Sequence, residues 1–271
     1  MPKTATQAVR ERPILFSAEM VRAVLDRRKT QTRRVLTPQP RDDDFAFDGP
    51  WWYRPGVVGR DGVLRPADAD VFGISTYDGE RGWRCPYGAP GDRLWVREAF
   101  RLHTNFDRRS PSEVRQRWNR ADHGGDLPSV YYGADHTGTG MLRDCDLRKA
   151  EHGDGHLLGR NRPSIHMPRW ASRLTLEVTG VRVERVQAIT EADALAEGIY
   201  ENAPGEMCPF RLRHPAGGYN AFQDPVTAFS FLWEGINAER GYGWDADPWV
   251  WVVEFRVLTP GAPGAAGGAD E

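Results

Sequence analysis

The sequence predicts an α+β fold in which a small mixed β-barrel carries short helices and long loop excursions. Segments with the two-residue alternation of strands are mixed with short segments of helical spacing. This order differs from the regular strand–helix alternation of a doubly wound parallel sheet and argues against that class. A small closed sheet crossed by helices accommodates the pattern better.

The first predicted elements are a helix and a strand near the N-terminus. Ser17 is a suitable N-cap, and apolar residues recur at helical spacing over 18–27. Residues 29–36 have the features of a turn that enters a strand. Residues 1–11 are polar, and we expect them to be flexible.

Three later segments show strand alternation. Residues 93–98 alternate after a turn at 90–92, and 174–183 alternate up to a phase shift at Thr179-Gly180, where a bulge or bend is expected. Residues 249–257 predict a closing strand with apolar side chains on both faces.

Two helices have clear start signals. Thr190 followed by Asp193 is the capping-box pattern, and this helix is predicted to end at Gly198. Asp224-Pro225 opens a longer helix. Its predicted apolar face consists of Phe229, Leu232, Trp233 and Ile236.

The remaining stretches are predicted to be excursions from a single domain. We expect that domain over 12–258. Its insertions are expected near 37–84, 103–160 and 199–223. The second insertion contains a short helix near 111–119 and a short strand at 129–132. The Pro/Gly/Ala-rich residues 259–271 are expected to be disordered.

The overall charge and hydropathy argue against a protein that coats nucleic acid and against one that spans a membrane. A formal net charge of −2 argues against a protein that coats DNA or RNA, although a local basic patch is compatible with it. No apolar run approaches the roughly 20 residues of a membrane span. The N-terminus has no secretory signal, so a cytoplasmic location without membrane contact is expected. The sequence does not indicate an oligomeric state.

The three cysteines, Cys85, Cys145 and Cys208, cannot all pair within one chain, as is typical of a reducing compartment. A zinc site formed by Cys145, His152 and His156, with Cys208 as a distant fourth ligand, is an alternative. The segment between the histidines is a glycine-containing turn rather than a knuckle that presents ligands, so we expect no metal and no cofactor.

Lys29 is the most informative basic residue. Of the 36 basic residues only Lys3, Lys29 and Lys149 are lysines. A buried lysine can act as a base, whereas arginine keeps its proton. Lys29 stands three residues before Thr32, and the two side chains meet only if Lys29 lies in the turn before the strand. Arg28, Arg33 and Arg34 could hold an anion, or this run is simply a solvated strand edge.

Two further segments carry candidate site residues. Trp95, Arg97 and Glu98 could face a cavity in which a ring stacks on a base, although a core strand explains the same pattern. Glu197 lies at a predicted helix C-terminus, where a negative charge opposes the helix dipole. It is either a solvated residue or one retained for another role.

Together these segments resemble the ASCH superfamily, which has a PUA-like fold. The resemblance is carried by DRRKTQTR (26–33), GDRLWV (91–96), the strand–helix unit 174–198 and the closing strand 249–257. Two longer segments are similar to a prophage-associated ASCH group. They are CPYGAPGDRLWVRE (85–98) and RPSIHMPRWASR (162–173).

The resemblance implies a metal-independent amidohydrolase that removes acyl groups from N4-acylated cytosine nucleosides or related modified bases. The lysine, threonine and glutamate of members that hydrolyse N4-acetylcytidine fall on Lys29, Thr32 and Glu197. Arg28 departs from the glycine usual before the lysine. The substrate-binding residues are expected to be Arg28, Arg33, Arg34, Trp95, Arg97, Glu98 and Trp170.

Two alternatives stay open beside the hydrolase. A non-catalytic module would bind RNA or a modified base in the same pocket, with Trp95 or Trp170 stacking on it. An ASCH-type nuclease would need a carboxylate cluster or a histidine pair, and His166 is the best isolated candidate; a structural role in its proline-bounded loop explains it better.

Overall fold

The computed structural model describes residues 8–41, 50–58, 60, 62–76, 81–120, 128–138, 158–201, 208–213 and 219–258. These residues form two compact units, each built from three separate stretches of chain. We call them unit one (Met1–Arg10, Arg28–Arg93 and Glu177–Arg256) and unit two (Glu11–Arg27, Leu94–Leu176 and Val257–Glu271). The expected single domain over 12–258 stays a prediction, and the expected tail at 259–271 lies outside the described residues.

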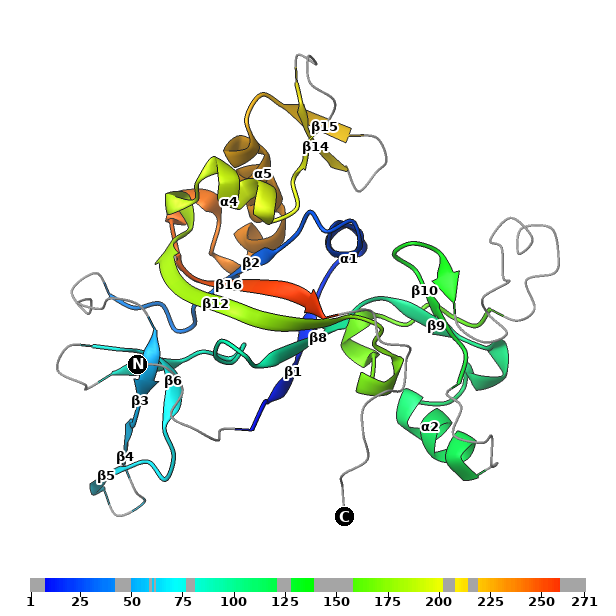
Figure 1. Cartoon of the computed structure of the whole chain (residues 1–271), viewed down its shortest axis with the longest axis horizontal. Coiled ribbons are helices and arrows are strands. Elements are labelled where there is room, and N and C mark those ends of the chain that lie inside the picture. Colours follow the sequence, from blue (N-terminus) through cyan, green and yellow to red (C-terminus); the bar gives the residue numbers. More distant parts are fainter. Residues whose placement is uncertain are drawn as a thin grey trace. The chain divides into compact units, whose positions relative to one another are not determined.

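The sheet of unit one contains three neighbouring strands, in the order β12 (Thr175–Arg185), β16 (Trp249–Leu258) and β2 (Gln31–Val35). β2 runs antiparallel to β16, with Thr32 opposite Val253 and Arg33 opposite Val252. Both faces of β16 are buried, as predicted. Figure 1 shows β12 and β16 as long curved ribbons.

β12 is continuous through Thr179-Gly180, so the phase shift in the sequence does not interrupt the strand. A Cβ atom at Gly180 would lie 2.6 Å from Oε2 of Glu254, so this carboxylate would have to shift to admit a side chain there.

Two helices cover one face of this sheet (Figure 1). α4 (Glu191–Ala196) begins at Thr190, whose hydroxyl accepts a hydrogen bond from the backbone N–H of Asp193, in the predicted capping box. α5 (Pro225–Asn237) begins at Asp224, whose carboxylate accepts from the N–H of Thr227. The two helices and the sheet share one apolar cluster, formed by Val186, Ile189, Ala194, Ile199, Ala228, Phe229, Trp233, Val250 and Val252.

One residue of the predicted α5 face is placed wrongly by the sequence. Phe229 and Trp233 are buried, but Ile236 is 46% exposed. Ala228 takes a buried position on this helix, because the apolar cluster lies toward 228, 229 and 233 rather than toward 236.

The first and third excursions contain short strands that the sequence did not predict. The first forms a three-stranded antiparallel sheet, β3 (Trp51–Tyr53), β6 (Val71–Ser75) and β7 (Gly82–Arg84), and a hairpin, β4 (Gly56–Val58) and β5 (Leu64–Pro66). The third forms another sheet, β13 (Tyr200–Glu201), β14 (Phe210–Arg213) and β15 (Tyr219–Phe222). These strands have only two to five residues, too few for a recognisable period.

In unit two, β1 (Glu11–Leu15) lies beside β8 (Arg93–Arg97), and α1 (Ala18–Leu25) follows β1 with Ser17 as its N-cap. Because β1 begins at Glu11, the expected flexible segment 1–11 is too long by at least this residue; residues 1–7 lie outside the described part. A second sheet has the order β11 (Thr137–Gly138), β10 (Val130–Tyr132) and β9 (Phe100–Leu102).

Helix α2 (Pro111–Arg120) packs on a separate apolar cluster in unit two. The buried members of this cluster are Phe100, Leu102, Val114, Val130, Tyr132, Met167 and Ala171. The predicted helix near 111–119 and the predicted strand at 129–132 are both present.

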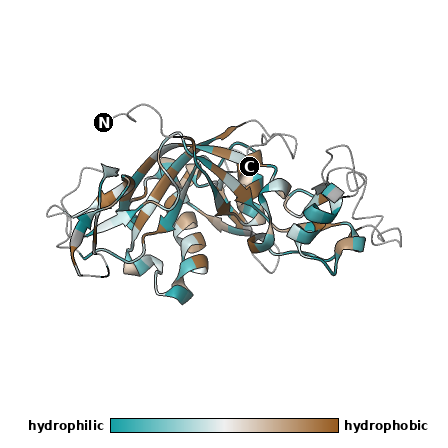
Figure 2. Cartoon of the chain, turned by 90° about the horizontal axis from the view of Figure 1, so that it is seen from below, coloured by the Kyte–Doolittle hydropathy of each residue, from teal (hydrophilic) through white to brown (hydrophobic). Residues whose placement is uncertain are grey.

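The mixture of helices and strands agrees with the predicted α+β class. Figure 2 shows hydrophobic and hydrophilic residues alternating along the strands, as expected when one face is more buried than the other. The described strands do not close into the predicted barrel. Within the described ranges no helix is long and apolar enough to cross a membrane.

Candidate functional site

Three consecutive residues before β2 bind the C-terminal end of α4. Thr30 N–H donates to the carbonyl of Ala196 at 2.8 Å, the Lys29 ammonium to that of Glu197 at 2.8 Å, and Arg28 Nη1 to that of Gly198 at 2.9 Å. The last carbonyls of a helix have no partner within the helix, so these donors satisfy groups that would otherwise need water.

Lys29 also forms a buried ion pair. Its Nζ lies 2.6 Å from Oε2 of Glu197, and the two side chains are 0% and 4% exposed. Burial lowers the pKa of Lys29; the Glu197 carboxylate opposes this shift, whereas the charges of Arg34 and Arg33 add to it. The result is a lysine that gives up its proton more readily than one in water.

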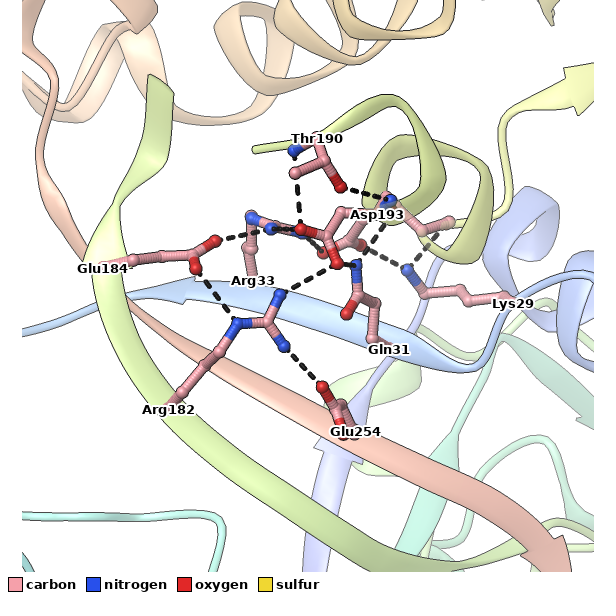
Figure 3. A network of polar contacts seen from close by, with 9 residues as sticks. Lys29, Gln31, Arg33, Arg182, Glu184, Thr190, Asp193 and Glu254 are labelled. Carbon is pink, nitrogen blue, oxygen red and sulfur yellow. Dashed lines mark hydrogen bonds and ion pairs between the residues drawn. The ribbon is translucent and has the colours of Figure 1, made fainter. Parts of the chain in front are cut away.

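Arg33 connects this pair to a larger polar network (Figure 3). Its guanidinium donates to Oε1 of Glu197 at 3.4 Å, to Oδ2 of Asp193 at 3.1 Å and to Oε1 of Glu184 at 2.5 Å. Gln31 Nε2 donates to the backbone carbonyl and to Oδ1 of Asp193, at 2.8 and 2.9 Å. The side chains of Lys29, Gln31 and Arg33 therefore all reach α4 or the strand that precedes it.

Arg182 forms the outer part of the network. Its three guanidinium nitrogens contact Glu184, Asp193 and Glu254. Burial alone would raise the pKa of Asp193, but the hydrogen bond from Gln31 and the charges of Arg182 and Arg33 outweigh it and hold this pKa well below its usual range. Asp193 is thus ionised at neutral pH, and its charge is balanced by two arginines.

Thr32 is separated from this network by the alternation of the strand. Gln31 and Arg33, its neighbours in β2, both direct their side chains toward Asp193. Successive side chains of a strand point to opposite faces, so Thr32 points to the other face, together with its cross-strand partner Val253. Thr32 is buried, and within the described residues it makes no hydrogen bond to Lys29 or Glu197.

The other two predicted arginines of unit one have different surroundings. Besides its bond to Gly198, Arg28 lies over the ring of Tyr200, 5.2 Å from the ring centroid. Burial lowers the pKa of Arg34, against the opposing influence of Tyr87 and Glu197. Arg34 alternates with Arg33 and therefore shares the Thr32 face of β2.

The remaining predicted site residues belong to unit two. Arg97 lies over the ring of Trp95 at 5.5 Å and donates to the carbonyl of Ile165. Glu98 is 1% exposed and accepts two hydrogen bonds from Arg173, at 2.8 and 3.0 Å. Trp170 is half-buried and packs against the apolar cluster of that unit. The structure therefore groups Lys29, Glu197 and Arg33 in unit one and places these four residues in the other unit.

The sequence did not identify Gln31, Arg182, Glu184 or Asp193 as members of the network. A signal was present for two of them. Gln31 and Arg33 alternate in a predicted strand, which places them on one face, and Asp193 is the acidic residue of the capping box. The link between the two segments, which lie about 160 residues apart in the chain, is visible only after folding.

Within the described ranges, no group of three or more His, Cys, Asp or Glu residues is placed to hold a metal ion. Of the residues in the alternative zinc site, Cys145, His152 and His156 lie outside the described residues. Cys208 is half-buried and Cys85 is buried, and neither forms a disulfide. His166 lies in a short 3-10 helix, Ser164–His166, and is exposed.

Comparisons of the chain with models of known protein families, with curated proteins and with solved structures gave no significant match.

Proposed function

We propose that the chain is a metal-independent amidohydrolase that removes acyl groups from N4-acylated cytosine nucleosides or related modified bases. The proposal includes a distant relationship to the PUA-like ASCH proteins, based on the resemblance of the Lys29 and Gly91 segments. The single observation that carries it is the buried Lys29–Glu197 pair, with a Lys29 pKa lowered by burial.

The proposed chemistry uses Lys29 as base and Thr32 as nucleophile. The neutral Lys29 amine takes the hydroxyl proton as Thr32 Oγ attacks the acyl carbon, and the amide oxygen becomes an oxyanion. When the oxyanion reforms the carbonyl, the C–N bond breaks and N4 receives the proton from Lys29. Water then attacks the Thr32 ester and loses a proton to Lys29. When this second oxyanion reforms the carbonyl, the bond from the acyl carbon to Thr32 Oγ breaks, Thr32 Oγ takes the proton back from Lys29, and the acid is released.

Contacts of Glu197 and the position of Lys29 in the chain support the roles proposed for these two residues. Glu197 holds the Lys29 Nζ with two oxygens, its carboxylate and its backbone carbonyl, and so positions the base. Lys29 precedes β2, which begins at Gln31. The alternation of side chains along β2, which puts Thr32 and Arg33 on opposite faces, therefore does not fix the direction of the Lys29 side chain. For catalysis, Lys29 Nζ must move from Glu197 toward Thr32, a step that the proposed mechanism requires.

The test is turnover by purified, metal-free protein with N4-acetylcytidine and a bulkier N4-acyl analogue. Release of cytidine is followed by chromatography, and an acyl-enzyme is sought by intact-mass measurement and peptide mapping. An acetyl group on Thr32 supports the mechanism. No cytidine from any N4-acyl cytosine tested overturns the proposal.

A second candidate, a non-catalytic module that binds RNA or a modified base, is favoured by one observation. Lys29 and its neighbours Arg28 and Thr30 donate to three consecutive carbonyls at and just beyond the end of α4, which by itself is a sufficient structural reason for a lysine here. This candidate predicts that Lys29→Arg binds ligand as well as the parent, because arginine also donates to carbonyls and carboxylates.

A further inference from the structure

Two stretches of unit two have a high positive charge, although the net charge of the whole chain is slightly negative. Residues 101–120 contain six arginines and two acidic residues, and 158–173 contain four arginines and no acidic residue. Ten positive and two negative charges give these two stretches a formal charge of +8, whereas the complete chain has −2. The two stretches lie together in unit two, around β9 and α2 (Figure 1).

Hydrogen bonds join the two stretches directly. Arg162 donates to the carbonyls of Arg109 and Phe106, at 3.0 and 2.7 Å, and the backbone N–H of Arg160 donates to Asp107 at 2.7 Å. Arg101 reaches the carbonyl of Gly159 at 3.4 Å. These bonds hold the segment 159–162 against residues 101–109, although the two segments are distant in sequence.

Most of these arginines have no carboxylate partner. Within the described residues, Arg169 pairs with Glu11 and Arg173 with Glu98, but six arginines with exposed or half-exposed side chains form no ion pair. They are Arg101, Arg108, Arg109, Arg115, Arg117 and Arg160. We call these six residues the arginine surface.

The two acidic residues nearby accept hydrogen bonds from neutral groups, and Glu113 also interacts with the charge of Arg109. The Asp107 carboxylate accepts from the backbone N–H of Arg160, and Glu113 accepts from the backbone and the hydroxyl of Ser110, at 2.7 and 2.8 Å. Arg162 adds a positive charge that is 4% exposed and bonded only to carbonyls within the described residues. A buried charge is screened less than an exposed one, so it strengthens the attraction of anions to this surface.

Aromatic rings lie among the arginines. Phe106 contacts the ring of Trp118 on α2 in an edge-on arrangement, with centroids 6.2 Å apart, and His103 contacts Phe106 at 6.4 Å. Trp118 is half-buried. Arginines that bind phosphates, combined with rings on which bases stack, are the features of surfaces that bind single-stranded nucleic acid.

We propose that the arginine surface binds the phosphate backbone of single-stranded nucleic acid, with Trp118 stacking on a base. Repeating phosphates suit several guanidinium groups that lack carboxylate partners, and the planar guanidinium binds phosphate through two hydrogen bonds. The inference concerns residues of unit two only and does not depend on the proposed amide hydrolysis in unit one.

The experiment measures binding of fluorescein-labelled single-stranded RNA and DNA to the full chain by fluorescence anisotropy, at 50–200 mM salt. A triple variant, Arg108→Gln, Arg117→Gln and Arg160→Gln, removes three exposed charges of the arginine surface. Loss of three phosphate contacts is expected to reduce the slope of log affinity against log salt by about 2. We expect affinity at the lowest salt to fall by about tenfold or more.

The matched control is a second triple variant, Arg54→Gln, Arg84→Gln and Arg256→Gln, with the same change in net charge on exposed residues of unit one. It is expected to retain the affinity and salt dependence of the parent, and both variants are expected to keep the parental melting temperature. Absence of binding by the parent, or an equal loss in both variants, overturns the proposal.

Two further arms test the chemistry of the partner. Trp118→Ala is expected to weaken binding about tenfold, and Trp118→Phe to restore most of it, because phenylalanine also stacks on bases. Competition by polyglutamate as effective as by unlabelled RNA would instead indicate an acidic protein as the partner and overturn the assignment. Lys29→Arg is expected to bind RNA like the parent, and the arginine triple variant to deacylate N4-acetylcytidine at the parental rate, which separates this inference from the proposed function.

Discussion

Glu197 in unit one and Glu98 in unit two are both buried carboxylates with a cation beside them, but the cations differ. Glu98 accepts two hydrogen bonds from Arg173, which also donates to Asp135 and Thr137 and lies over the ring of Tyr132 at 4.2 Å. Glu197 is held by Lys29, with Arg33 at a longer distance.

The pKa values of the two cations, Arg173 and Lys29, are shifted in opposite directions. Burial alone would lower the pKa of Arg173, but its hydrogen bonds to Glu98 and Asp135 outweigh burial and raise it. For Lys29, burial outweighs the attraction of Glu197 and the pKa falls. Arg173 therefore keeps its proton, as in a structural ion pair, whereas Lys29 gives up its proton more readily than a lysine in water.

The largest expected effect is a loss of deacylation activity on substitution of Lys29, which distinguishes the Lys29–Glu197 pair from the Arg173–Glu98 pair. Lys29→Arg keeps the positive charge and removes the base, so we expect deacylation of N4-acetylcytidine to fall by about 10³-fold or more. The measurement is kcat/KM for cytidine release. The matched control, Arg173→Lys, changes the other buried cation and is expected to retain parental kcat/KM in the fraction that is folded. A Lys29→Arg variant at full rate would show that both pairs are structural.

The next largest expected effect is a loss of folding stability on substitution of Arg173 in the Arg173–Glu98 pair. Arg173→Met leaves Glu98 buried without its cation, and we expect the free energy of unfolding to fall by about 3–5 kcal/mol, measured by urea denaturation. Burial already raises the pKa of Glu98, against the hydrogen bonds from Arg173, so removal of Arg173 leaves only the unfavourable contribution. The double variant with Glu98→Gln is expected to recover part of the loss. A loss below about 1 kcal/mol for Arg173→Met would contradict this account.

The variant Glu197→Gln tests the pKa of Lys29 through the pH dependence of the free energy of unfolding. Loss of the carboxylate removes the influence that raises the pKa of Lys29, so this pKa falls further below the unfolded value near 10.4. The unfolded chain then binds more protons between the two pKa values, and stability rises with pH in that window, by about 1.4 kcal/mol for each pH unit that separates them. Urea denaturation from pH 7 to 10 measures the rise. Adding Lys29→Met is expected to abolish it, and a slope that persists in the double variant would have another origin.

The smallest effect concerns Asp193, which links Gln31, Arg33 and Arg182. Because the pKa of Asp193 is depressed in the folded chain, its contribution to stability is present above the unfolded value near 3.9 and is lost as pH falls below it. Asp193 is partly exposed, so we expect a loss of about 1 kcal/mol. Asp193→Asn is expected to flatten this part of the acid unfolding curve. An unchanged curve would show that the network contributes little to stability.

The sequence predicted the starts of three helices correctly. Ser17, Thr190 and Asp224 each begin a helix by capping the first N–H groups, since caps depend on residues only three positions apart. Lys29 and Glu197 were singled out individually, and the structure brings them into contact at 2.6 Å; their assignment to a catalytic site stays a prediction. Ile236 and the short strands of the excursions were missed, because burial of a single helix face and pairing of three-residue strands depend on distant partners.

The sequence by itself thus determined where the helices α1, α4 and α5 begin and where the strands β8, β12 and β16 run. Through the alternation of strand residues it also determined which side chains of β2 share a face. The tertiary structure decided which of these faces meet. It brought Gln31 and Arg33 to Asp193, and it placed Thr32 on the face opposite to them. It also left six arginines of unit two without an ion pair among the residues that the structure describes. The reason is physical: alternation and capping act over a few residues, whereas ion pairs and burial join segments more than a hundred residues apart.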